Sequence, residues 1–328
     1  MRYLSYLLAA LFAWSSAPAS AQVDQQRCDW PAFENPCEVK GGVYRALAPR
    51  GTGPHKTILY LYGSTGHSRE VTEASFFQRI VDRYGYALVV PGALDIRYRG
   101  GFSDTGWTLR NGKQKTRNEI EFLKNVMNDA AYRFGLDLDN VLVMGQSRGG
   151  FLIWEIACHN PEIGSAYAVH AGGYLGRLPG RCQQPVKFLH THGAQDKIVD
   201  YGGMENVSGN VDMRSIPDAM KMLERTNGCD ERSLEPTSTV PNFARYTYSN
   251  CAPGSALELM LHKGGHDYPA NWIKVAIDWF EDVNAGPSLL PSADPTAAGK
   301  SIRFKGAGAS TGFGTTTSRS RFKSVPKQ

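Results

Sequence analysis

The sequence predicts an α/β protein with a mostly parallel central sheet and helices on both of its faces. Short runs of apolar and β-branched residues alternate along the chain with segments of helical spacing, which is the pattern of a parallel sheet. Several runs are apolar at every position, as expected of strands buried on both faces. With 328 residues, 41% of them hydrophobic, the chain is long enough for one large domain with a full core.

The elements follow from these runs and their periodicity. The expected strands are residues 43–48, 57–62, 86–90, 141–144, 165–171, 186–192 and 256–261. The expected helices are residues 71–84, 118–134, 151–158, 216–226 and 271–283. Residues 93–115 show no periodicity and are expected to form a long loop, which in a compact domain is usually functional or mobile.

The N-terminus has the features of a secretory signal peptide, predicted over residues 1–21. Arg2 is the only charged residue in this stretch, and residues 4–14 form an apolar core that is too short to span a bilayer. Small residues at 19–21 fit a cleavage site. We therefore expect an exported protein, secreted or periplasmic, and no other segment is apolar enough to predict a membrane span.

The C-terminal segment, residues 286–328, is rich in Gly, Ser, Thr, Pro and Ala and is expected to be disordered. Seven basic residues and one acidic residue give it a charge of +6, so the chain before it has a net charge of −1 within the total of +5. Residues 22–285 are thus the expected folded domain, and their near-neutral charge argues against a nucleic-acid-binding domain. The basic tail is expected to give weak tethering to anionic surfaces.

Six cysteines in an exported protein predict disulfides. Short spacing favours the pairs Cys28–Cys37 and Cys229–Cys251, after which Cys158 and Cys182 either pair or stay buried as thiols. Because no Cys-x-x-Cys pair is present, a metal or redox site is not expected.

The candidate nucleophile is Ser147, in the pattern Gly145-Gln-Ser-Arg-Gly149 between an expected strand and an expected helix. A sharp turn in this context lifts the serine Oγ clear of the backbone. Glycines two positions to either side remove Cβ atoms that would collide there. The start of the helix supplies the backbone N–H of Arg148 to an oxyanion.

The acid and the base are expected after the serine, in that order, where later strands end. Asp196 follows the strand at 186–192, and His266 lies in a glycine-rich loop after the strand at 256–261. In this arrangement His266 takes the serine proton, and Asp196 holds the imidazole tautomer and stabilises the imidazolium.

Other candidates are weighed against these residues. Asp200, four residues after Asp196, is the alternative acid. His190 and His192 alternate along a strand and so share a face, but no third ligand is evident and strand packing is the expected role. His170 ends an apolar run and is expected to be a hydrogen-bonded core histidine.

A second oxyanion donor is expected in the loop after the strand at 57–62. The backbone N–H of Ser64 is the first candidate, and that of Thr65 is the alternative. Trp107 and Tyr268 are candidates for the substrate cleft, whereas the apolar stripe of the last helix favours a core position for Trp272.

Taken together, several segments are similar to one family. They are residues 62–66, 140–150, 192–196, 227–229 with Cys251, and 264–269. Over about residues 43–283 the sequence resembles the secreted α/β-hydrolase esterases of the polyhydroxybutyrate depolymerase and feruloyl or acetylxylan esterase group. The resemblance implies the α/β-hydrolase fold, an ester substrate, a Ser147–Asp196–His266 triad and a Cys229–Cys251 disulfide.

The sequence also departs from this family. The loop that usually begins His-Gly reads Tyr62-Gly-Ser64, Arg148 replaces the polar residue that usually follows the nucleophile, and Tyr268 replaces a tryptophan. These changes bear on the substrate more than on the reaction. Arg148 is expected to be structural, the alternative being a contact with a substrate carboxylate. The tail does not resemble the separate binding domain of extracellular depolymerases, which argues against attack on solid polyester.

These observations predict an exported serine esterase that works through an acyl-enzyme, needs no cofactor, and acts on small or polymeric esters. The alternatives are an acyltransferase with the same triad, a peptidase-like serine hydrolase, and a non-catalytic secreted binding protein.

Overall fold

The computed structural model describes residues 28, 35–97, 103–110, 116–207, 211–232 and 236–285. The predicted signal peptide and the predicted basic tail lie outside these residues. Within the described part of the chain, no helix combines the length and the apolar character that a membrane crossing needs.

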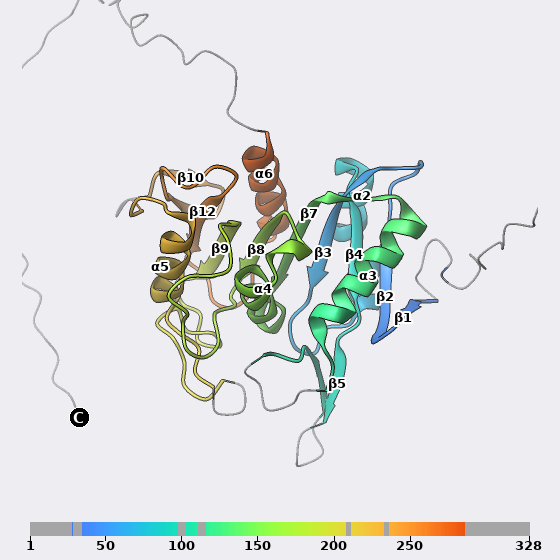
Figure 1. The fold of residues 1–328 in the computed structure, drawn as a ribbon, viewed down its shortest axis with the longest axis horizontal. Helices are drawn as coiled ribbons and strands as arrows, with labels where there is room; N and C mark the ends of the chain where they lie inside the picture. The colour runs from blue at the N-terminus through green and yellow to red at the C-terminus, as the bar shows by residue number, and fades with distance from the viewer. Residues whose placement is uncertain are drawn as a thin grey trace, which may run out of the picture. The chain divides into compact units, whose positions relative to one another are not determined.

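A ten-stranded sheet forms the centre of the fold, in the order β1-β2-β4-β3-β7-β8-β9-β12-β11-β10 (Figure 1). The pairs from β4 through β12 are parallel, and the outer pairs on each side are antiparallel. Its strands are β1 (Cys37–Val39), β2 (Gly42–Leu47), β3 (His55–Leu61), β4 (Ala87–Pro91), β7 (Leu136–Gln146), β8 (Ala166–His170), β9 (Lys187–Gly193), β10 (Ser238–Val240), β11 (Phe243–Thr247) and β12 (Ala256–His262). The predicted mostly parallel sheet is therefore confirmed.

Helices cover both faces of this sheet, with α3 in front of it and α2 behind it in Figure 1. The helices are α1 (Ser68–Glu73), α2 (Ser75–Tyr84), α3 (Glu119–Phe134), α4 (Ser147–His159), α5 (Ile216–Asn227) and α6 (Trp272–Asn284). A short 3-10 helix, η2 (Pro161–Ile163), follows α4. Each predicted helix has a counterpart in this set.

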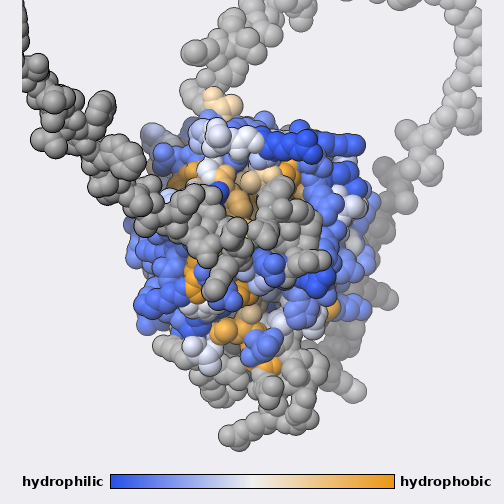
Figure 2. Space-filling model, turned by 90° about the vertical axis from the view of Figure 1, so that its right-hand side faces the viewer, coloured by the Kyte–Doolittle hydropathy of each residue, from blue (hydrophilic) through white to orange (hydrophobic). Residues whose placement is uncertain are grey.

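The apolar runs of the parallel strands form the core. Ile58 of β3, Leu88 of β4 and Val143 of β7 have no exposed surface. Trp154 of α4 packs on Phe188 of β9 with ring centroids 4.4 Å apart, which seats the helix on the sheet. On the face that Figure 2 shows, hydrophilic residues cover most of the described surface, and hydrophobic residues form small patches.

The predicted helix boundaries hold where capping residues mark them. Asn118 accepts a hydrogen bond from the backbone N–H of Glu121 at the start of α3, and Ser215 accepts one from Asp218 at the start of α5. Gly228 ends α5 in the left-handed conformation, with φ 63°, as the Asn-Gly pair predicts.

Two expectations about the secondary structure are corrected. The helix predicted at 71–84 is interrupted at Ala74, whose ψ of 119° is extended, and α2 begins immediately after it. The loop predicted at 93–115 contains a small hairpin of β5 (Leu94–Arg97) and β6 (Ser103–Gly106). The edge strands β1, β10 and β11 were not predicted, because runs this short carry too few residues to show a period.

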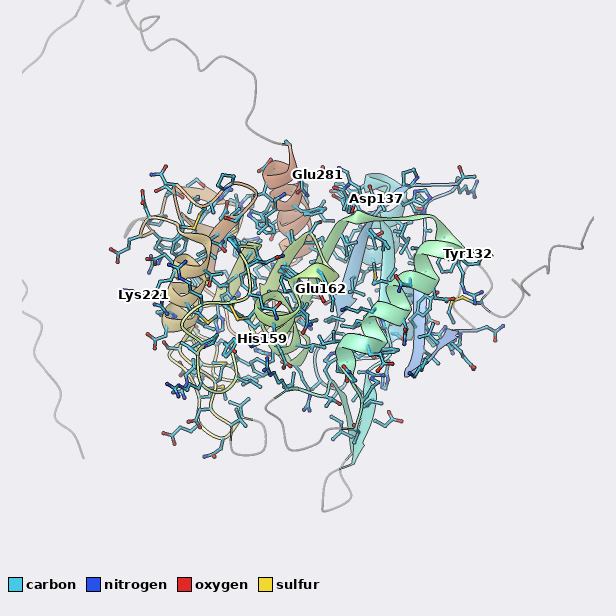
Figure 3. All side chains as sticks on the ribbon, viewed as in Figure 1. Tyr132, Asp137, His159, Glu162, Lys221 and Glu281 are labelled. Carbon is cyan, nitrogen blue, oxygen red and sulfur yellow. A yellow bond between two sulfur atoms is a disulfide. The ribbon has the colours of Figure 1, made fainter. Side chains whose placement is uncertain are left out.

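The C-terminal end of helix α6 is fixed to the sheet by hydrogen bonds. Glu281, labelled in Figure 3, accepts a hydrogen bond from Lys56 Nζ at 2.6 Å and another from the hydroxyl of Tyr86. Lys56 lies at the start of β3, and Tyr86 immediately precedes β4. The last turn of α6 is therefore held where the parallel strands β3 and β4 begin, at the edge opposite to the one where they end.

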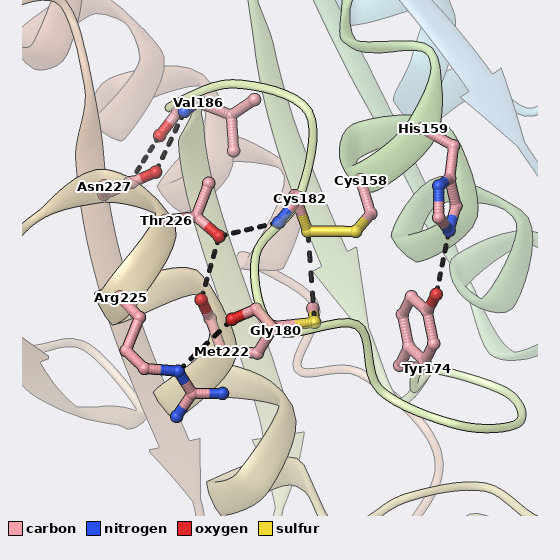
Figure 4. Close-up of a disulfide and its surroundings, with 10 residues drawn as sticks. All are labelled: Cys158, His159, Tyr174, Gly180, Cys182, Val186, Met222, Arg225, Thr226 and Asn227. Atoms are coloured by element: carbon pink, nitrogen blue, oxygen red, sulfur yellow. Dashed lines mark hydrogen bonds between the residues drawn. A yellow bond between two sulfur atoms is a disulfide. The ribbon is translucent and has the colours of Figure 1, made fainter.

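Three disulfides are formed: Cys28–Cys37, Cys158–Cys182 and Cys229–Cys251. The two pairs favoured by spacing are present, and the sequence had left the fate of the remaining cysteines open. Figure 4 shows the Cys158–Cys182 bridge between the end of α4 and the segment before β9. The backbone N–H of Cys182 donates to Thr226 Oγ1 at 2.9 Å, so this bridge also joins α4 to the end of α5.

Candidate active site

Ser147 lies on a strained turn between β7 and α4. Its φ is 51°, in the left-handed region that residues other than glycine rarely adopt. Such strain persists only where the surrounding structure enforces it, and it gathers at functional sites. The sharp strand-to-helix turn predicted from the Gly-x-Ser-x-Gly pattern is present at this position.

The glycines of this pattern are required by the neighbouring strand. A Cβ on Gly145 would lie 2.0 Å from the carbonyl oxygen of Leu61, and a Cβ on Gly149 would lie 2.0 Å from the same oxygen. Both separations are impossible for real atoms, so the end of β3 approaches the turn only because both positions are glycine. Close backbone packing against β3 therefore helps to fix the place of Ser147.

The loop after β3 lies beside the serine. A Cβ on Gly63 would lie 3.2 Å from the Cβ of Ser147. The next residues, Ser64 and Thr65, are exposed, and Thr65 has a φ of 63°. This position agrees with the expectation that a backbone N–H of Ser64, or of Thr65, serves an oxyanion on Ser147.

The same loop is supported from the protein core by Trp107. The indole nitrogen donates to the carbonyl oxygen of Tyr62 at 2.9 Å, and the two rings lie 5.4 Å apart. Trp107 has no exposed surface. The expectation that its side chain lines the cleft is therefore wrong, and its role is to support the loop from the core.

Arg148 directs its side chain toward the β6 segment. A Cβ on Gly106 would lie 2.4 Å from Arg148 Nε, and Nη2 donates to the carbonyl oxygen of Trp107 at 3.4 Å. These contacts agree with the structural role expected for the guanidinium. The backbone N–H at the start of α4 remains the feature of Arg148 that is relevant to an oxyanion.

Asp196 and His266 are brought together at the same edge of the sheet. His266 Nδ1 and Asp196 Oδ2 are 2.9 Å apart, and the carboxylate is fully buried while the imidazole is 20% exposed. Because a carboxylate only accepts, Nδ1 carries the proton, and Nε2 of the neutral ring then holds the lone pair. The alternative acid, Asp200, is exposed and accepts from the backbone N–H of Gly202, so the structure favours Asp196.

Two backbone donors fix the carboxylate from the other side. Asp196 Oδ1 accepts hydrogen bonds from the N–H groups of Ile198 and Val199, both at 2.9 Å. Burial acts to raise the pKa of Asp196, but these hydrogen bonds and the one from His266 more than offset it, so the pKa is lowered. The group is therefore an ionised acceptor at neutral pH.

The paired histidines of β9 support this carboxylate. His190 Nε2 and His192 Nδ1 are 3.1 Å apart, and His192 Nε2 donates to the carbonyl oxygen of Val199 at 2.8 Å. Both rings are fully buried, which lowers their pKa values and keeps them neutral. Among the described residues no three His, Cys, Asp or Glu side chains are grouped as a metal ion would require.

A groove of about 950 Å³ lies beside the loop that carries His266. Tyr268 lines it, together with Phe243, Tyr246 and Leu261 from the outer strands. Tyr268 is partly buried, whereas Trp272 is fully buried and packs on it with ring centroids 5.0 Å apart. Ser147 does not line this groove.

His170 is a further residue of the site whose contact the sequence did not reveal. Its ring is fully buried, as expected for a core histidine, but Nε2 lies 3.2 Å from the backbone carbonyl oxygen of His266. One signal was available in the sequence. His170 ends an apolar strand, β8, and this strand lies in chain order between the strand before Ser147 and the strand before Asp196.

The chain is similar to known esterases. No family model matches the chain. The chain is 21% identical over 283 residues to a bifunctional acetylxylan esterase/xylanase of Neocallimastix patriciarum, covering 80% of this chain and 39% of that protein. It is 23% identical over 237 residues to a probable feruloyl esterase C of Aspergillus niger, covering 70% of this chain and 78% of that protein.

Among solved structures, the acetyl xylan esterase from Aspergillus awamori matches with a TM-score of 0.51 and 16% identity, covering 73% of this chain and 93% of that one. A likeness at this level concerns the fold. The expected similarity to acetylxylan and feruloyl esterases is confirmed by these relatives, and the chain has the α/β-hydrolase fold.

Proposed function

We propose that the protein is an exported carboxylic-ester hydrolase with Ser147 as nucleophile, His266 as base and Asp196 as the residue that orients the base. The observation that carries this proposal is the 2.9 Å pairing of His266 with a buried Asp196 at the sheet edge where Ser147 occupies its strained turn. The esterase relatives support the same reaction class.

The reaction proceeds in two halves. Ser147 Oγ attacks the ester carbonyl while its proton passes to His266 Nε2, and the oxyanion is held by the backbone N–H groups of Ser64 and Arg148. The carbonyl re-forms and expels the alcohol, which takes the proton from His266. Water then attacks the acyl-enzyme with His266 as base, releasing the acid and restoring Ser147.

The groove beside the histidine loop supports an ester with a large alcohol portion. His266 delivers its proton to the leaving alcohol, so the alcohol departs on the side of this loop. Tyr246 and Tyr268 offer partly exposed aromatic faces there, and such surfaces suit sugar rings as well as aromatic groups. Acetylated or feruloylated polysaccharides, the substrates in the names of the relatives, fit this arrangement.

The disulfides and the predicted signal peptide support export, since disulfides persist in oxidising compartments. Tethering by the basic residues of 286–328 remains part of the proposal. Deleting this tail is expected to abolish retention on an anionic resin at low salt, and unchanged retention would contradict the tethering.

The test compares purified protein with its Ser147→Ala variant on an acetyl ester, methyl ferulate, acetylated xylan and soluble 3-hydroxybutyrate oligomers. The variant is expected to lose about 10³-fold or more in kcat on the substrate that the wild type cleaves. Ser255→Ala is the matched control, because that hydroxyl only donates within its own turn, to Ala252. Absence of cleavage by the wild type contradicts the proposal, and transfer to an added alcohol that outpaces hydrolysis indicates an acyltransferase.

A further inference from the structure

The structure points to a residue outside the candidate triad that controls the placement of its base. We propose that His170 is a positioning residue for His266: its Nε2–H holds the backbone carbonyl of His266 and thereby aligns the imidazole between Asp196 and Ser147. This inference rests on the proposed function, and it adds a residue from β8, which supplies no member of the triad.

The hydrogen-bond pattern fixes which nitrogen of His170 carries the proton. The carbonyl of His266 only accepts, so His170 Nε2, at 3.2 Å, must be the donor. Thr191 Oγ1 lies 3.0 Å from His170 Nδ1 and 2.9 Å from the carbonyl oxygen of Val169, so with the ring proton on Nε2 its single hydroxyl proton is shared between these two acceptors. Burial lowers the pKa of His170 to about 3, which keeps the ring in this neutral form.

The ring of His170 is held from several sides, so its position is well defined. It has no exposed surface and stacks on His262 with centroids 5.3 Å apart. Tyr268 and Trp272 contact it at centroid distances of 5.8 and 5.5 Å. These neighbours come from β12, from the loop after His266 and from α6, so His170 lies where the elements that flank the base converge.

The loop that carries His266 has further fixed points just before this contact. The backbone N–H of Gly264 donates to His262 Nδ1 at 3.1 Å, and the carbonyl of Gly264 accepts from Gln195 at 3.0 Å. A Cβ on Gly193 would lie 2.0 Å from the carbonyl oxygen of Gly265. These contacts seat the loop before His266, whereas the contact of His170 acts on His266 itself.

A small error in the placement of a base is costly, because about 1 Å of misplacement of a reacting group reduces a rate by about 10²-fold. Loss of the His170 donor leaves Asp196 bonded to the imidazole but frees the backbone from which the ring extends. The expected consequence is a lower kcat with an unchanged KM, since His170 is buried beneath the loop and does not reach the cleft.

The test uses two variants of the full-length protein. His170→Phe keeps an aromatic ring of similar size and removes the donor, and kcat is expected to fall about 10- to 100-fold with KM within about threefold. His170→Gln places an amide N–H near the same carbonyl and is expected to retain kcat within about threefold. His159→Phe is the matched control, because His159 bonds to Tyr174 at 2.8 Å, away from the triad.

A spectroscopic readout separates positioning from general stability. The downfield proton NMR resonance of His266 Nδ1–H, assigned by its loss in His266→Ala, is expected to be sharp in the wild type and in His170→Gln. In His170→Phe it is expected to broaden or shift. The inference is overturned if His170→Phe keeps wild-type kcat and resonance, or if His170→Gln is as impaired as His170→Phe while both unfold at the wild-type midpoint.

If His170→Phe does not fold, Thr191→Val replaces it as the test. This nearly isosteric change removes the hydroxyl that lies within hydrogen-bond distance of His170 Nδ1 and of the Val169 carbonyl oxygen, and kcat is expected to fall several-fold with KM unchanged. Unchanged kcat overturns the inference. Failure of the proposed function is recognised separately, because the wild type then cleaves no ester, and the Nδ1–H resonance alone decides whether His170 positions His266.

Discussion

The nucleophile and the acid–base pair lie at the same edge of the sheet, but they are held there by different physical means. Ser147 is placed by the backbone, since Gly145 and Gly149 let the carbonyl of Leu61 approach where any Cβ would collide. Asp196 and His266 are placed by hydrogen bonds from buried side chains and from a loop. The first arrangement depends on the absence of side chains, and the second depends on their chemistry.

This difference predicts different sensitivities to mutation. On the nucleophile side, adding a single carbon atom at Gly145 or Gly149 is expected to be disruptive. On the acid–base side, the removal of one donor or one charge changes the reaction while the fold is retained.

The largest effect is expected for Gly145→Ala. The new Cβ would lie 2.0 Å from the carbonyl oxygen of Leu61, so β3 and β7 would have to separate. We expect destabilisation beyond the roughly 1–3 kcal/mol of ordinary overpacking, and little folded protein. Thermal unfolding and soluble yield measure this. Gly180→Ala is the matched control, because its Cβ would enter open space, and a wild-type midpoint for Gly145→Ala would contradict the argument.

Asp196→Asn is expected to have the next largest effect, on rate and not on folding. The amide retains an acceptor for the N–H groups of Ile198 and Val199 but turns a donor toward His266, which favours the wrong tautomer of the imidazole. We expect kcat to fall on the order of 10³- to 10⁴-fold. Asp200→Asn serves as the comparison, and an equal loss in both variants would show that the acid is misassigned.

The buried histidines predict a loss of stability in acid. Burial lowers the folded-state pKa values of His170, His190, His192 and His262 below the ordinary value of 6.5. The unfolded chain therefore binds more protons below that pH, so their stabilising contribution is complete above pH 6.5 and is lost as the pH falls toward the lowered values, about 3 for His170.

Urea unfolding between pH 7 and pH 5 measures this loss, at up to about 1.4 kcal/mol per pH unit for each histidine. His190→Gln keeps a donor for His192 and removes one titrating group, so its stability is expected to vary less steeply with pH. A free energy of unfolding that does not change over this interval would contradict the prediction.

The smallest effect is expected for Arg148→Gln. The guanidinium donates to the carbonyl of Trp107, and loss of that hydrogen bond is expected to cost roughly 0.5–1.5 kcal/mol of stability. We expect kcat/KM to change less than about threefold, equally for a neutral acetyl ester and for an anionic succinyl ester. A selective loss on the anionic ester would instead show that Arg148 binds a substrate carboxylate.

The same contrast explains what could be predicted from the sequence. The place of Ser147 was predictable because glycine spacing between a strand and a helix is a local pattern. Asp196 and His266 were predictable only as positions after strands, since their pairing depends on which strands become neighbours. The contact of His170 with the carbonyl of His266 joins residues 96 positions apart and has no local pattern.

Other differences have similar causes. The largely buried strands β3, β4 and β9 were expected, whereas β10 and β11, whose residues are mostly polar or only partly buried, were not. Trp107 was assigned to the cleft because it lies in a long irregular stretch, and only the structure shows its indole donating to Tyr62 from the core. Burial depends on the whole fold, so it is not visible in the neighbours of a single residue.

Both rims of the large sheet are short, since β1 and β10 have three residues each. An incoming strand extends a sheet by pairing with the free N–H and C=O groups of an edge strand, and edge strands of three residues offer only a few such groups. A partly unfolded chain with an exposed strand is the partner that such pairing requires. Short edge strands offer such chains few groups to pair with, so intact molecules are expected to resist fibril formation even when they are concentrated on a surface.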